Sequence, residues 1–377
     1  MVESELQATR GGTQVSAVAV HTLGTAVPVA SFSQEIATGL AAERCCGNQR
    51  ERGWLERIYR ASGVRRRGSV LLHHDDDHAS IEAFYRRRET ADDRGPTTAV
   101  RLARYMQEAG KLAARACHAA FADSAIEPMH ITHLVTVSCT GLFSPGLDAE
   151  LIQELGLPRD VGRLNLGFMG CHGALNGLRA ASALAESRPD ARVLLCCVEL
   201  CSLHFCYGWN PQQVIANALF ADGAAAAVLA PTNGAGLHLQ GTASLLTHDS
   251  SEAMTWRIGD HGFEMGLTQE VPRRIRASLK EWLEPWLASH GLAVGDVAHW
   301  AIHPGGPEII HAAIDSLGVP VTAGNPSRTV LAEHGNMSSP TVLFILQRMR
   351  AHGAVGPIVA LGFGPGLVFE AALFHAS

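Results

Sequence analysis

The sequence has no CxxC pair, although it contains nine cysteines. Structural zinc sites use such pairs, and small secreted proteins use an even set of cysteines as a disulfide framework. A chain of 377 residues is also too long to need disulfide staples. The cysteines therefore indicate free thiols in a reducing compartment, with no zinc site and no disulfide framework.

Long apolar runs and an excess of positive charge are also absent. No run approaches the ~20 apolar residues of a membrane-spanning helix. The N-terminal segment MVESELQATRGGTQ lacks the basic start and apolar stretch of a secretory signal. A formal net charge of -6 provides no general attraction to nucleic acid. We expect a cytoplasmic protein with no membrane span and no nucleic-acid partner.

Charged residues are scarce at 18%, whereas apolar residues make up 47% of the chain, which is typical of a globular protein with a large core. Apolar strand patterns alternate with amphipathic helix patterns, which predicts an α/β fold. The predicted elements are a strand at 15–22, an Arg-rich helix within 50–70, a polar loop with a short helix at 73–95, a long helix from residue 96, and buried strands at 131–141, 192–200 and 223–231.

A weak internal repeat divides the chain into two halves. The order of helix, strand with a polar turn, helix and apolar strand occurs at 100–200 and again at 270–370. Cys171 and Asn336 are predicted to open helices in corresponding positions, and Cys139 and His303 to end strands. We therefore expect a tail at 1–14 and two duplicated α/β halves at 15–232 and 237–377. Their strand ends and helix starts should surround one centre.

Cys171 is the candidate nucleophile. It lies in GFMGCHGALNG, at the expected start of a helix, where the helix dipole would lower the pKa of a thiol and free N–H groups could bind an oxyanion. A small buried cysteine packed like alanine is the structural alternative.

His303 and Asn336 are the candidate partners. His303, in AIHPGGPEII, could accept the thiol proton, and the amide of Asn336, in EHGNMSSPTVLF, could donate to an oxyanion. A structural histidine and a helix N-cap are the respective alternatives. The run from His73 to His78 contains metal-ligand types, although a solvated loop is the commoner explanation.

At these segments the sequence resembles the type III polyketide synthases, the chalcone synthase family. The carrying motifs are LGFMGCHGAL, HPGGPEII, GNMSSPTVLFIL and GFGPGL, in the family's order, and the resemblance covers nearly the whole chain from about residue 15. It implies a thiolase fold with a layered αβαβα core and a homodimer. It also implies loading of an acyl-CoA starter on Cys171, decarboxylative extension with malonyl-CoA assisted by His303 and Asn336, and no metal or redox cofactor.

The resemblance also assigns cavity residues. Phe220 matches a gatekeeper phenylalanine, although a plain core aromatic is the alternative, and Met265 stands at the second gatekeeper position in place of phenylalanine. The other cavity positions are Thr140, Cys201, His204, Trp256 and Ser338. The closing loop, implied in cyclisation, consists of Gly362, Phe363, Gly364, Pro365 and Gly366. Ser144 replaces a methionine that reaches toward the partner subunit in the family. These departures argue against a chalcone-type product, and methionine at 265 would admit a different or longer starter.

Arg57, Arg60 and Arg65 fall in the region where the family binds the phosphates of CoA, which guanidinium groups suit well. A solvated basic helix face is the alternative. Three functions stay open: an iterative synthase making a pyrone, resorcinol or phenolic; a single-step condensing enzyme or acyltransferase of the ketoacyl synthase III type; and a non-catalytic scaffold. The complete Cys-His-Asn set disfavours the scaffold.

Overall fold

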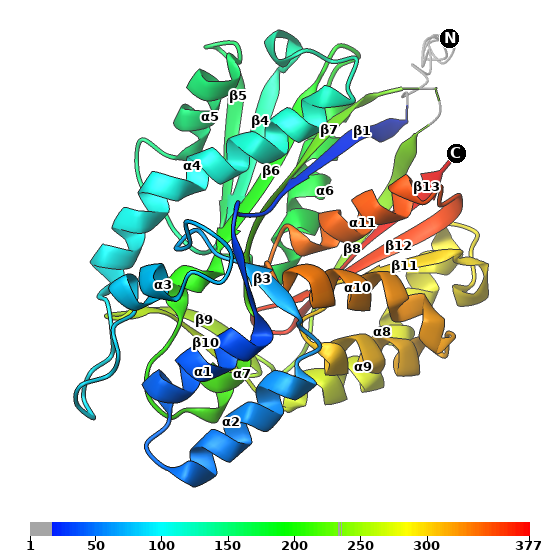
Figure 1. Cartoon of the computed structure of the whole chain (residues 1–377). Helices are drawn as coiled ribbons and strands as arrows, with labels where there is room; N and C mark the ends of the chain where they lie inside the picture. Colours follow the sequence, from blue (N-terminus) through cyan, green and yellow to red (C-terminus); the bar gives the residue numbers. More distant parts are fainter. Residues whose placement is uncertain (1–16, 233, 235) are drawn as a thin grey trace, which may run out of the picture.

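The computed structural model describes residues 17–232, 234 and 236–377 of the protein (Figure 1). The α-helices are α1 (Gln34–Cys45), α2 (Gln49–Ala61), α3 (His78–Phe84), α4 (Thr98–Ala122), α5 (Leu147–Leu155), α6 (Gly173–Glu186), α7 (Pro211–Leu219), α8 (Glu270–Ser289), α9 (Pro307–Leu317), α10 (Asn325–His334) and α11 (Thr341–Ala351). The strands are β1 (Val18–Ala26), β2 (Ser31–Ser33), β3 (Arg66–Gly68), β4 (His133–Ser138), β5 (Gly162–Gly167), β6 (Val193–Leu200), β7 (Asp222–Pro231), β8 (Leu237–Leu246), β9 (Met254–Gly259), β10 (Gly262–Leu267), β11 (His299–Ile302), β12 (Gly356–Gly364) and β13 (Val368–Ala376).

One large mixed sheet runs through the molecule in the order β11-β12-β13-β8-β1-β7-β6-β4-β5. On one side β4 is parallel to β6, β6 is antiparallel to β7, and β7 is antiparallel to β1. On the other side β11, β12, β13 and β8 repeat these directions in the same order. The two groups meet where Ala19 pairs with His238 and Val20 with Leu237. This arrangement supports the duplication that the sequence suggests.

Helices cover both faces of each strand group. In β6, Leu194, Cys196 and Val198 pack in a cluster with α4, whereas Leu195 and Cys197 pack in a cluster with α6 and α11. The alternation follows from side chains pointing to opposite faces along a strand. A third cluster joins α8 and α9 to the outer face of β11–β13. The layers therefore run α4, strands, α6 with α11, strands, and α8 with α9, which is the αβαβα core expected from the resemblance (Figure 1).

Most predicted elements are found, with two differences. The strand expected at 15–22 is β1, which begins at Val18 and ends at Ala26, and residues 15 and 16 lie outside the described residues, as does the 1–14 tail. Asn336 does not open a helix, because α11 begins at Thr341 and its N-cap is Pro340. Both the helix start and the N-cap interpretation of Asn336 were therefore wrong.

Additional elements gather beside the strand ends of the N-terminal half. Helices α1, α2, α3 and α7 lie with the β9–β10 hairpin at the lower left of Figure 1. No helix among the described residues is both long and apolar enough to cross a membrane.

Candidate active site

Cys171 lies in a 3-10 turn, Gly170–His172, directly before α6. Two left-handed residues shape this turn: Phe168 has φ 57° and Gly170 has φ 71°. A left-handed phenylalanine is strained, and such strain collects at functional sites. Gly170 is also required by space, since a Cβ there would lie 2.5 Å from Pro365 Cδ. The turn therefore packs closely against the loop that contains Pro365, and Cys171 within it is 5% exposed.

His303 directly follows β11 and is 1% exposed. Its backbone N–H donates to Leu361 O at 2.8 Å, which fixes the residue beside β12. Neither ring nitrogen has a hydrogen-bond partner among the described residues. Burial, together with nearby His172, lowers the pKa of His303 to about 3, so the ring is neutral. A buried imidazole with both nitrogens unpaired is unusual and indicates a site for a ligand.

Asn336 is held by the segment that carries Phe220. Asn336 N donates to Leu219 O at 2.8 Å, and Ala221 N donates to Asn336 O at 2.9 Å, which forms an isolated parallel bridge. The side-chain Oδ1 accepts from Ser338 N at 2.8 Å. This bond orients the amide and leaves its NH₂ group as the available donor.

Cys171, His303 and Asn336 line one small cavity of about 20 Å³, so the structure brings the three predicted residues together from three separate segments. Burial raises the pKa of the Cys171 thiol to about 11, whereas hydrogen bonding to Ser338 and Asn336 favours the thiolate and Glu199 opposes it. The expected lowering of this pKa by the helix start was therefore wrong. Desolvation is the largest cause of the shift, because the thiol is buried. These pKa shifts favour a neutral thiol and a neutral imidazole in this cavity.

Ser338 and Glu199 are the polar residues that affect the Cys171 thiol, Ser338 through a hydrogen bond and Glu199 through its charge. The Ser338 hydroxyl lies 3.5 Å from Cys139 Sγ, and its backbone has φ 56°. Glu199 is fully buried and accepts from Thr140 Oγ1 at 2.7 Å and Ser339 Oγ at 2.6 Å. Burial raises the pKa of Glu199. Sequence reasoning missed this residue, although a single carboxylate at the end of the apolar run RVLLCCVEL is a recognisable signal.

A larger cavity, which we call the apolar pocket, adjoins the site. Its volume is about 80 Å³, and its walls come mainly from α1, α7, the β9–β10 hairpin and the segment from Cys201 to Phe205. Phe220 and Met265 line this pocket and both cavities beside Cys171, so they stand at the junction. Cys201 and Trp256 are also shared with one of those cavities, which Thr140 and Ser338 line as well.

His204 forms a rigid wall of the apolar pocket. Its Nε2–H donates to Thr140 O at 2.6 Å, and its Nδ1 accepts from Phe263 N at 3.0 Å, which together fix one neutral tautomer. The ring stacks on Phe263 with centroids 4.3 Å apart. Trp256 meets both rings edge-on and donates to Cys139 O at 2.6 Å. His204, Trp256 and Phe263 therefore form a rigid aromatic wall of the apolar pocket.

The closing loop joins β12 to β13. Gly362, Phe363 and Gly364 end β12, and Phe363 lines the cavity of Cys171, His303 and Asn336. Pro365 lines the neighbouring cavity. Gly366 N donates to Met254 O at 2.8 Å, which ties the loop to the start of β9.

The three predicted CoA-binding arginines lie on the surface. Arg57 and Arg60 are exposed, one helical turn apart on α2, whose Tyr59 lines the apolar pocket. Arg65 is 71% exposed and lies 3.9 Å from Glu333. Ser144 is exposed as well.

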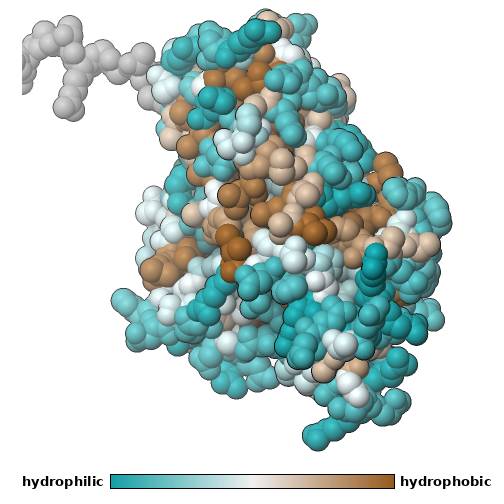
Figure 2. Space-filling view, turned by 90° about the vertical axis from the view of Figure 1, so that its left-hand side faces the viewer, coloured by the Kyte–Doolittle hydropathy of each residue, from teal (hydrophilic) through white to brown (hydrophobic). Residues whose placement is uncertain are grey.

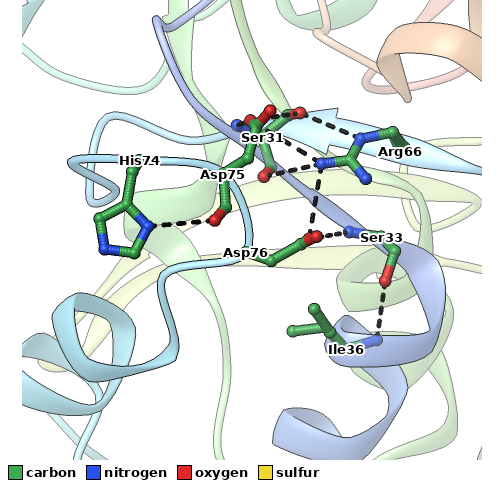
Figure 3. Close-up of polar contacts among 7 residues, drawn as sticks. All are labelled: Ser31, Ser33, Ile36, Arg66, His74, Asp75 and Asp76. Carbon is green, nitrogen blue, oxygen red and sulfur yellow. Dashed lines mark hydrogen bonds and ion pairs between the residues drawn. The ribbon is translucent and has the colours of Figure 1, made fainter.

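The three aspartates of the 73–78 run accept hydrogen bonds from backbone N–H groups. Asp75 Oδ1 accepts from Ser31 N at 2.7 Å, and Asp76 Oδ1 accepts from Ser33 N at 3.0 Å and lies 3.5 Å from Arg66 Nη2 (Figure 3). Asp77 caps α3 through Ser80 N. Across residues 17–232, 234 and 236–377, no three His, Cys, Asp or Glu side chains are placed to share a metal ion.

Two family profiles match nearly the whole chain. The profile of chalcone and stilbene synthases, N-terminal domain, matches residues 4–232, and the C-terminal domain profile matches residues 238–377. The chain therefore belongs to the chalcone and stilbene synthase family and is a type III polyketide synthase, a transferase that catalyses decarboxylative condensation.

Two of the similar proteins come from bacteria. The chain is 33% identical over 368 residues to the 1,3,6,8-tetrahydroxynaphthalene synthase of Streptomyces peucetius, covering 96% of this chain and 93% of the relative. It is 29% identical over 366 residues to the alpha-pyrone synthesis polyketide synthase-like Pks18 of Mycobacterium tuberculosis, covering 94% and 90%.

Solved structures agree with this assignment. The crystal structure of PKS-I from the brown alga Ectocarpus siliculosus superposes with a TM-score of 0.87 at 30% identity, covering 97% of this chain and 100% of that one. The C-terminal type III domain of Steely1 from Dictyostelium gives a TM-score of 0.86 at 26% identity, covering 96% and 99%. The fold is thus the thiolase fold predicted from the sequence.

Proposed function

We propose that Cys171 carries the growing acyl chain and that His303 and Asn336 serve both chemical steps. The observation that supports this most directly is the shared cavity, in which a thiol, an oriented amide and an imidazole with no hydrogen-bond partner in the described part of the chain converge. No structural role accounts for both unpaired nitrogens of His303.

In the loading step, His303 accepts the Cys171 proton and the thiolate attacks the carbonyl of the acyl-CoA thioester. The carbon–sulfur bond to CoA breaks, and the CoA thiolate takes the proton from His303. Because burial raises the pKa of Cys171 to about 11, we propose that His303 takes the proton after substrate has bound.

In the extension step, His303 and Asn336 donate hydrogen bonds to the thioester carbonyl of malonyl-CoA. The carboxylate leaves as CO₂, and its electron pair forms an enolate that these donors stabilise. The enolate carbon attacks the Cys171 thioester, which lengthens the chain by two carbons and regenerates the thiolate. The substrates are therefore CoA thioesters, and this scheme requires no metal or redox cofactor.

The starter group should extend past Phe220 and Met265 into the apolar pocket. The lining of this pocket contains no carboxylate and is mainly apolar, which suits an acyl tail. A flexible methionine at 265 leaves a wider passage than an aromatic ring. Among the relatives, one name states a tetrahydroxynaphthalene product and another alpha-pyrone synthesis. For this chain we propose release as a pyrone, resorcinol or phenolic, shaped by the 362–366 loop.

Arg57, Arg60 and Arg65 are proposed to hold the CoA phosphates, since all three are exposed near the elements that wall the apolar pocket. The single-step condensing enzyme remains the second candidate. We also propose a cytoplasmic location, because all nine cysteines are free thiols.

A homodimer is proposed through the face that holds β5. This strand ends the large sheet, and Leu164 on it is 38% exposed. Phe168, Met169 and Leu142 add exposed apolar surface in neighbouring segments. Figure 2 views this side of the molecule and shows apolar patches between the hydrophilic ones. A free strand edge beside apolar side chains is suited to pairing with a second copy.

The test is incubation of the purified protein with malonyl-CoA and acyl-CoA starters from acetyl to palmitoyl plus an aromatic one. Mass spectrometry should show the starter bound to Cys171 and products that grow by two-carbon units. Cys171→Ala should lose loading and product while its thermal unfolding midpoint stays near native. Product from Cys171→Ala would overturn the assignment, and a single addition would favour the single-step enzyme.

A further inference from the structure

His172, the neighbour of Cys171, has a buried side chain that the proposed mechanism does not use. It is 4% exposed and forms the N-cap position of α6. Its Nδ1 lies 2.6 Å from Asn176 Oδ1, one helical turn later. Asn176 Nδ2 donates to Glu370 Oε1 at 2.9 Å, so the Asn176 oxygen acts as acceptor and the His172 Nδ1 carries the proton.

Glu370 anchors this chain of hydrogen bonds in the other half of the molecule. It lies on β13, opposite Gly362 of β12, and is 2% exposed. It also accepts from Ser244 Oγ at 2.7 Å and pairs with Arg179 of α6. The carboxylate is therefore fully engaged, and the Asn176 amide is rigidly oriented toward His172.

The imidazole of His172 fills the space beside two glycines of the closing loop. A Cβ on Gly364 would lie 2.1 Å from His172 Cδ2, and a Cβ on Gly362 would lie 3.0 Å from His172 Cβ. Together with the contact of Gly170 and Pro365, the ring forms the packing surface between the Cys171 turn and the loop. Phe363 and Pro365 of this loop line the cavities in which the chain must grow.

We propose that His172 is a positioning residue for the condensation step: held by Asn176 and Glu370, its ring keeps the turn that carries Cys171 against the 362–366 loop. Loading needs only the thiol and His303, whereas condensation needs the Cys171 thioester and the enolate at a fixed separation. Loss of the oriented ring should therefore slow condensation more than loading. This inference rests on the proposed role of Cys171.

The experiment uses Asn176→Leu, which keeps the ring of His172 but removes its hydrogen-bond acceptor. The rate constant of starter loading, from the mass of the protein in single turnover, should stay within about threefold of native. The kcat for formation of the product extended by two carbons should fall on the order of tenfold, with little change in the KM for malonyl-CoA. The kcat of Glu370→Gln should fall as well. Ser182→Ala, elsewhere on α6, should keep the native kcat and the native loading rate.

Asn176→Asp separates positioning from simple destabilisation. It restores an acceptor for His172 but places a second carboxylate beside Glu370, so it should be less stable than native and yet recover most of the kcat that Asn176→Leu loses. Native kcat in Asn176→Leu, or kcat values that follow the unfolding midpoints across the variants, would overturn the inference. Absence of starter on Cys171 in the native protein would instead overturn the proposed function.

Discussion

At the scale of single residues, desolvation governs the chemistry of this site. Cys171 and His303 are both shifted toward their neutral forms, with pKa values of about 11 and about 3. With these pKa values we expect no ion pair of thiolate and imidazolium at neutral pH, and we propose that proton transfer accompanies substrate binding.

Alkylation of Cys171 should show this directly. The pKa of the thiol is raised to about 11. At any pH below this value, each increase of one pH unit raises the thiolate fraction about tenfold. The rate of reaction with iodoacetamide at Cys171, measured by peptide mass spectrometry, should rise continuously from pH 7 to 9.5. Cys171→Ala corrects for the other thiols, and a rate that levels off near pH 7 would show a preformed ion pair.

Met265 should control the length of the starter. Met265→Phe places a rigid ring opposite Phe220 at the junction of the cavities. Starters of long chain length should lose activity while acetyl-CoA retains it, as measured by product mass across the starter series. Met106→Phe, on exposed α4 surface, serves as the control. An unchanged starter profile would remove Met265 from the passage.

At the scale of elements, Arg67 binds the C-terminal end of α7, the segment that leads to Phe220 and pairs with Asn336. Arg67 is 3% exposed and donates to Asn217 O at 2.7 Å, Ala218 O at 2.8 Å and Phe220 O at 2.9 Å. It thereby satisfies carbonyl groups at the end of α7, of which Ala218 O also accepts from Gln34 Nε2 at 2.9 Å.

Replacing Arg67 should therefore destabilise the fold. Arg67→Met removes the side-chain donor of the Asn217 and Phe220 carbonyls, and the free energy of unfolding in urea should fall by about 3 kcal/mol. Arg66→Met is the matched control, because Arg66 is 40% exposed and its ion pair with Asp76 should contribute less than about 1 kcal/mol. Equal losses in the two variants would contradict the role of Arg67.

The sequence predicted most of the elements and the convergence of Cys171, His303 and Asn336, for physical reasons that also explain its failures. Apolar periodicity located β4, β6 and α4, and the glycines around Cys171 and His303 indicated tight turns. The apolar pocket was not foreseen, since α1, α7 and the β9–β10 hairpin meet only in the folded chain. The pKa of Cys171 was wrong in direction because burial depends on the closing loop nearly 200 residues away.

At the scale of the whole molecule, the free edge of β5 predicts the assembly. The native protein should elute with light-scattering mass of two chains, and Leu164→Glu should shift it toward one chain by placing charges on the shared face. Val321→Glu, at an exposed position in the C-terminal half, should leave the mass unchanged. A monomeric native protein would contradict the proposed dimer.

The division of labour between the layered core and the elements beside it has a consequence for evolution. Cys171, His303 and Asn336 belong to the duplicated core, whereas the apolar pocket is walled largely by α1, α7 and the β9–β10 hairpin. Under the proposed function, mutations in α1, α7 or the β9–β10 hairpin would alter the substrate range while the three residues of the core keep their roles. Homologues of this chain could therefore diversify their products through changes in these peripheral segments while the core stays the same.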